Sequence, residues 1–233
     1  MVRPTPHLKH LNHMPQLVIK WGPRIVWPIV YLIIVVLSVF SLLRIADMMG
    51  VLPPPSEAQF GPPVEFNTRY LDQVELSVIH MATGLAFILL APLQFSKSFR
   101  SKHLVIHRWT GRVLVCCAII SAITGIMAAH LLPAFGGFSS TVASWLLGIL
   151  MIISVVSAVW CARSRLYVQH REWMIRAFAI GLSVGTQRIL IFIFMPMQVA
   201  SFQDIFAPTL WLGAALNLIV AECWINLTRK PIR

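Results

Sequence analysis

Long apolar segments alternate along the whole chain with short basic or proline-rich segments. A transmembrane helix needs about 20 mostly apolar residues to cross a hydrocarbon layer of about 30 Å. Six segments fit this requirement: Trp27–Leu43, Val74–Leu93, Val113–Leu132, Val142–Ala162, Met174–Met195 and Phe206–Ile225. The pattern therefore predicts an all-α integral membrane protein with six transmembrane helices in one bundle.

The polar segments between these helices are too short to fold as a separate soluble domain. We expect a cytoplasmic tail at 1–24, a transmembrane domain at 25–226 and a second cytoplasmic tail at 227–233. The basic segment before the first helix is too long for a signal peptide, so this helix is predicted to be an uncleaved anchor. Residues 51–63 are rich in proline, which predicts an extended segment across the outer surface.

Small and β-branched residues predict how the helices pack. Gly181 and Gly185 form a GxxxG pattern, which allows close contact between helices and is a weak signal for dimerisation. The first helix instead has a β-branched face that favours contact with lipid at the edge of the bundle, and its residues are Ile29, Val30, Ile33, Ile34, Val35 and Val36.

The composition excludes other classes of protein. Apolar residues make up 58% of the 233 residues, charged residues only 12%, and the mean hydropathy is +0.77. Soluble domains have about twice this charged fraction, and disordered chains have low hydrophobicity. The four cysteines are sparse and lie within apolar segments, which argues against a disulfide scaffold.

The basic residues predict the orientation. Of the 19 lysines and arginines, 16 lie on one side of the six helices, and only Arg44, Arg69 and Arg188 do not. By the positive-inside rule both termini are cytoplasmic, and we expect a multi-pass protein of the bacterial cytoplasmic (inner) membrane. The net charge of +11 is then explained by topology and by anionic lipid headgroups, so nucleic acid is not an expected partner.

Ionisable groups at membrane depth are costly and are therefore candidate functional residues. His80 and Arg188 lie at similar depths from the outer side. Arg188 needs a partner, which could be backbone carbonyls, Gln187, a ligand carboxylate or an outer-loop acid. An interhelical clamp, a ligand site and a proton path all stay open for Arg188, and His80 is either a ligand or a structural hydrogen-bonding group. Glu222 is expected to snorkel or to cap its helix close to Arg229.

Two cytoplasmic motifs have a similar form: His107-Arg-Trp-Thr-Gly-Arg112 and His170-Arg-Glu-Trp-Met-Ile-Arg176. Each places arginines near the start of a helix, where free N–H groups and the helix dipole favour anions. Lipid headgroups and heme propionates are the candidate ligands. A b-type heme needs two imidazoles and cations near its propionates. The predicted iron ligands are His80, His107 and His170, and the predicted propionate ligands are Arg108, Arg112, Arg171, Arg176 and Arg188.

These residues predict a heme-b or quinone-associated redox protein. His80 would ligate iron together with His107 or His170. A further arrangement is two stacked hemes, with an inner pair of His107 and His170 and an outer pair of His80 and His130. A second hypothesis is a non-enzymatic accessory or structural subunit of a larger respiratory or photosynthetic complex. Its arginine clusters would bind lipid or the partner. A third is a small-solute permease, against which the short loops and unbroken helices count. No catalytic residue set is recognisable, so an enzymatic activity stays undecided.

The order of these motifs resembles a known family. It runs His80-x3-Gly84, Leu90-Ala-Pro92-x-Gln94-Phe95, His107-Arg-x2-Gly-Arg112, His170-Arg-x-Trp-Met-x-Arg176, Arg188 and Trp211…Asn217-Leu-x-Val-Ala-Glu222. The chain resembles, over about residues 74–226, the bacterial predicted membrane proteins catalogued as domain of unknown function 2306. The family's usual glycine before Pro92 is alanine here, and His130 lies outside the motifs. The resemblance implies that the motif histidines and arginines, Asn217 and Glu222 are important, and it implies no activity.

Overall fold

The chain folds into helices connected by short segments. The computed structural model describes residues 6–52, 63–198 and 200–229, with side chains from residue 22 onward except that of residue 67. No strand occurs in these ranges. The elements are α1 (Pro6–Met48), α2 (Val64–Thr68), η1 (Arg69–Gln73), α3 (Val74–Phe95), α4 (Lys97–Lys102), α5 (Leu104–Leu131), α6 (Gly137–Arg163), α7 (Tyr167–Phe194), η2 (Met195–Met197) and α8 (Phe202–Thr228).

The prediction of six membrane-spanning helices in an all-α protein is confirmed. The segments long and apolar enough to span are Gly22–Met48, Val64–Phe95, Leu104–Leu131, Gly137–Arg163, Tyr167–Met197 and Phe202–Thr228. They extend beyond the predicted ends, because a helix continues into the polar interface after its apolar residues end. The helix α1 begins at Pro6, within the predicted N-terminal tail. Most of the predicted extended segment 51–63 lies outside the described residues.

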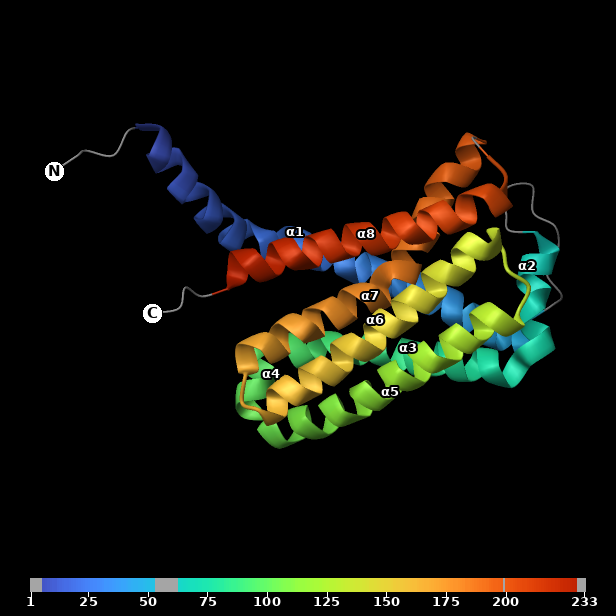
Figure 1. The fold of residues 1–233 in the computed structure, drawn as a ribbon, viewed down its shortest axis with the longest axis horizontal. Coiled ribbons are helices and arrows are strands. Elements are labelled where there is room, and N and C mark those ends of the chain that lie inside the picture. The colour runs from blue at the N-terminus through green and yellow to red at the C-terminus, as the bar shows by residue number, and fades with distance from the viewer. Residues whose placement is uncertain (1–5, 53–62, 199, 230–233) are drawn as a thin grey trace.

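The helices α3, α5, α6 and α7 pack as a bundle, and α1 and α8 lie along one side of it (Figure 1). The helix α5 lies between α3 and α6, α7 packs on α6 and α8, and α1 packs on α7 and α3. The start of α1 and the end of α8 point to the same end of the bundle as α4. We name this the inner end and the opposite end, with α2 and the α5–α6 turn, the outer end. The names follow the charge-based prediction of orientation, which stays a prediction.

The GxxxG residues of α7 lie inside the bundle. A Cβ atom added to Gly181 would lie 2.9 Å from Ile88 Cδ1 of α3, and one added to Gly185 would lie 2.6 Å from Ile33 Cγ2 of α1. This face is therefore covered by the chain's own helices. The prediction that the β-branched face of α1 contacts lipid is wrong in part. Ile33 and Ile34 are buried in the core of the bundle, with Ile33 against α7, whereas Ile29 and Val35 are exposed.

Candidate functional site

A cavity of about 480 Å³ lies in the outer half of the bundle. Its walls come from α1, α2, η1, α3, α5, α6, α7 and α8, and most of the lining is apolar. Few lining residues are ionisable, and they are Arg44, Arg69, Tyr70, His80 and Arg188. A cavity of roughly 300–1,000 Å³ with apolar walls and a few convergent polar groups is typical of small-molecule sites.

His80 contributes an imidazole to the wall of this cavity. Its Nδ1 lies 2.9 Å from the Ser121 carbonyl oxygen of α5. A carbonyl only accepts hydrogen bonds, so Nδ1 donates, and in the neutral imidazole Nε2 then keeps its lone pair. The ring lies against Gly125, where an added Cβ would be 2.8 Å from His80 Cε1. The polar contact therefore fixes both the tautomer and the position of the ring.

Two guanidinium groups share one set of aromatic rings at the outer end of the cavity. The Arg69 Cζ atom lies 4.4 Å from the ring centre of Phe66 and 5.2 Å from that of Phe135. The Arg188 Cζ atom lies 5.4 Å from Phe66 and 5.8 Å from Phe206. We call these five residues the arginine–aromatic box. Cation–π contacts stabilise a guanidinium by about 0.5–2 kcal/mol each, and they leave its N–H groups free for other partners.

Hydrogen bonds satisfy Arg69 only in part. Its Nη1 donates to the Pro133 carbonyl at 3.1 Å, and its Nη2 donates to the Tyr70 hydroxyl at 2.9 Å. Its Nε is buried and has no hydrogen-bond partner among the described residues. Tyr70 also interacts with Arg188. Gln187, one of the partners considered for Arg188, instead donates to the Phe206 carbonyl at 2.9 Å.

Within the described ranges, no carboxylate forms an ion pair with Arg69 or Arg188. The nearby carboxylate of Asp47 lies 2.7 Å from Arg44 Nη1. The box therefore holds two positive charges that aromatic rings and neutral oxygens stabilise. Such a group can bind the oxygens of a carboxylate, a phosphate or a polarised carbonyl.

The histidines of the two basic motifs lie at the inner end, away from the cavity. His170 Nδ1 lies 2.9 Å from the Ala158 carbonyl oxygen, which fixes its tautomer in the same way as that of His80. His107 is near enough to His170 and Arg100 to interact with them electrostatically, and its Nδ1 is buried without a hydrogen-bond partner in the described structure. These two imidazoles are thus neighbours at the starts of α5 and α7.

The pairing of His80 with His107 on one iron is wrong. His80 contacts α5 at Ser121, which follows His107 by about 14 residues, or about 21 Å along the helix. Imidazoles on one iron must both lie within about 2–3 Å of it. His170 neighbours His107, so it is also remote from His80. His130 packs on Trp145, with 6.3 Å between ring centres, and does not line the cavity.

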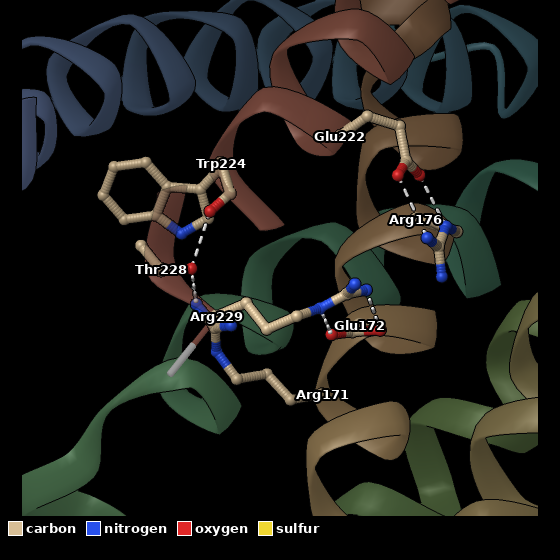
Figure 2. A network of polar contacts seen from close by, with 7 residues as sticks. All are labelled: Arg171, Glu172, Arg176, Glu222, Trp224, Thr228 and Arg229. Carbon is tan, nitrogen blue, oxygen red and sulfur yellow. Dashed lines mark hydrogen bonds and ion pairs between the residues drawn. The ribbon is translucent and has the colours of Figure 1, made fainter. Parts of the chain in front are cut away.

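Two ion pairs join α7 to the C-terminal end of α8, and one of them engages the predicted propionate ligand Arg176 (Figure 2). Arg176 binds Glu222 through two hydrogen bonds of 2.5 and 3.0 Å. Arg229 binds Glu172 at 2.8 and 3.0 Å, and this carboxylate raises the pKa of the Arg229 guanidinium. Glu222 was expected to lie close to Arg229 as a snorkelling or capping group. It is near enough to Arg229 to interact with it electrostatically, and its ion pair is with Arg176.

Two further arginines of the inner motifs also have partners in the protein. Arg171 donates to the Thr228 hydroxyl at 2.8 Å (Figure 2), and the Arg112 guanidinium lies 4.7 Å from the ring centre of Trp109. Arg108 is exposed. Of the predicted site residues, the structure therefore brings only His80 and Arg188 to the cavity, and it groups the others at the inner end.

Sequence reasoning missed Arg69, Tyr70 and Phe66 as site residues. All three lie just before the predicted second helix, in a segment assigned to the outer loop. One signal could have found Arg69: it is one of the few basic residues on the side where the positive-inside rule disfavours them.

The fold and the site define a polytopic membrane protein with a ligand-sized cavity among the residues described. The chain belongs to the family of predicted membrane proteins called DUF2306, whose pattern matches residues 77–225. The match begins before His80 and ends after Glu222, so it includes the motifs from which the resemblance was inferred. No curated protein and no solved structure matches the chain.

Proposed function

We propose that this protein is a heme-b or quinone-associated redox protein of the bacterial cytoplasmic membrane, with the outer cavity as its cofactor site. One observation carries the proposal: an imidazole whose Nδ1 is bound to a backbone carbonyl lies in the wall of an apolar cavity inside the bundle. Histidines that ligate metals typically donate their other ring N–H to a carbonyl or carboxylate. His80 makes this contact with Ser121, which leaves Nε2 as the ligating nitrogen.

The remaining walls fit the same class of cofactor. The apolar lining suits a porphyrin or a quinone ring with its hydrocarbon tail, and the volume lies within the range of small-molecule sites. The arginine–aromatic box supplies donors for heme propionates or for quinone oxygens. Arg188 keeps its predicted role as a propionate ligand, and Arg69 takes the place of the inner arginines.

The inner histidines are a separate site in this proposal. His107 and His170 are neighbours on α5 and α7, and His170 has the same fixed tautomer as His80. They would ligate a second heme, independent of the outer one. Arg108 and Arg112 belong to this end of the bundle and would hold its propionates.

Absorbance spectroscopy tests the proposal. We expect the purified full chain to show a b-type alpha band in the dithionite-minus-air spectrum, with its stoichiometry measured as pyridine hemochrome. Solvent extraction with chromatography would detect a quinone. His80→Ala should abolish the outer-site signal, and the matched control His130→Ala, at the same end of the bundle but off the cavity, should retain it. Folded protein without heme or extractable quinone would overturn the proposal.

The α7–α8 ion pairs favour a second candidate, a non-enzymatic accessory or structural subunit. Arginines that are bound to Glu172 and Glu222 serve to lock helices rather than to hold a cofactor. In this case the protein would copurify with a respiratory or photosynthetic complex and would carry no chromophore of its own.

A further inference from the structure

The arginine–aromatic box has two cations and no described counter-charge, at the end of an apolar cavity. We infer that it is a receptor for the anionic head of an amphiphile whose hydrocarbon body fills the cavity. The inference rests on the proposed role of this cavity as a ligand site, but it does not require a heme or a quinone. The head is a carboxylate or a phosphate, and its natural source is the membrane.

The first argument is the charge at membrane depth. Arg188 lies within a membrane-spanning helix, and its described contacts are aromatic rings and a hydroxyl group. A guanidinium at this depth is costly, and it is usually found with a counter-charge or with carbonyl oxygens. Arg69 shares the Phe66 and Phe206 rings with Arg188, so each cation also repels the other. An anion between them would remove both penalties.

The second argument is the orphaned donor. Arg69 uses Nη1 and Nη2 for protein oxygens, while its buried Nε has none in the described structure. An unpaired buried donor costs about 1–3 kcal/mol. An oxygen of a bound anion would satisfy it, with the Tyr70 hydroxyl beside it as a further donor.

The third argument is the shape of the site. Phe66, Phe135 and Phe206 surround the cations at the outer end, and Phe87, Ile88 and Met151 line the cavity further along the bundle. A soluble anion would leave this apolar space unfilled. An anionic head with a hydrocarbon body satisfies the charged end and fills the apolar part, so the chemistry favours an amphiphile.

Binding of oleic acid, with oleyl alcohol as its uncharged partner, tests this inference. The measurement is calorimetric titration of the detergent-purified full chain at mildly alkaline pH, where the acid is ionised. Oleate should bind at least about tenfold more tightly than oleyl alcohol. Arg69→Gln and Arg188→Gln should each weaken oleate binding about tenfold and leave the alcohol unchanged. Arg188→Lys, which keeps the charge, should retain most of the selectivity. Arg163→Gln at the exposed inner end is the matched control.

Competition distinguishes the source of the head. Displacement of oleate by phosphatidylglycerol but not by inorganic phosphate supports a phospholipid, and failure of both to displace it supports a long-chain acid. Displacement by inorganic phosphate, or equal binding of oleate and oleyl alcohol, overturns the inference. Absence of both heme and extractable quinone, combined with charge-selective binding, would defeat only the redox proposal. Bound heme together with loss of charge selectivity would defeat only this inference.

Discussion

At the scale of single residues, the position of His80 depends on the absence of a side chain at residue 125. A Cβ atom there would lie 2.8 Å from His80 Cε1 and 3.2 Å from Nδ1. We expect Gly125→Ala to displace the ring, weaken its bond to Ser121 and cost about 1–3 kcal/mol by overpacking. Thermal unfolding of the purified variant measures this loss.

A second glycine of the same helix provides the control for this prediction. A Cβ added to Gly111 would meet Gln94 Oε1 at 3.6 Å, an ordinary contact. Alanine is a better helix former than glycine, so Gly111→Ala should leave the melting temperature unchanged or raise it slightly. Equal behaviour of the two variants would show that His80 is not held by the space at Gly125.

The residues of the site could be predicted only where an ionisable side chain lies deep within a membrane-spanning segment. His80 and Arg188 stand out because each is an ionisable group within an apolar segment. The box was not predictable in the same way, since Phe66, Phe135 and Phe206 come from three distant parts of the chain. Local sequence patterns carry no information on contacts of this range.

At the scale of helices, the ion pair Arg176–Glu222 joins α7 and α8. Glu222 is 45% exposed and Arg176 is 24% exposed, so solvent weakens the pair. A double-mutant cycle with Arg176→Gln and Glu222→Gln should give a coupling free energy of about 0.2–1 kcal/mol in unfolding experiments. Glu75→Gln, an exposed acid at the opposite end, is the control.

The same variants test whether Arg176 also serves a cofactor. If its role is to join the two helices, Arg176→Gln should leave any heme or quinone signal unchanged. Additive stability effects, or loss of the signal in Arg176→Gln with no loss in Glu222→Gln, would return Arg176 to the role of a propionate ligand.

The helices themselves were predictable because each must satisfy its own backbone hydrogen bonds in lipid, which requires long apolar segments. Which helices pack against one another was less predictable. The GxxxG pattern of α7 correctly indicates close contact, yet it does not say that Ile33 of α1 and Ile88 of α3 cover it. Likewise, the β-branched face of α1 is compatible with lipid and with α7, because both surfaces are apolar.

At the scale of the whole molecule, the orientation decides which leaflet supplies the cavity. Six spans place the two termini on the same side, and the 16 basic residues predict that this side is the cytoplasm. Single cysteines at exposed positions test it, in a background that replaces the four native cysteines with alanine. With a membrane-impermeant maleimide on intact spheroplasts, Ala134→Cys at the outer end should react at once. Ser164→Cys at the inner end should react only after lysis. The reverse result would place the arginine–aromatic box at the cytoplasmic leaflet, and its anionic ligand would then have to enter from that side.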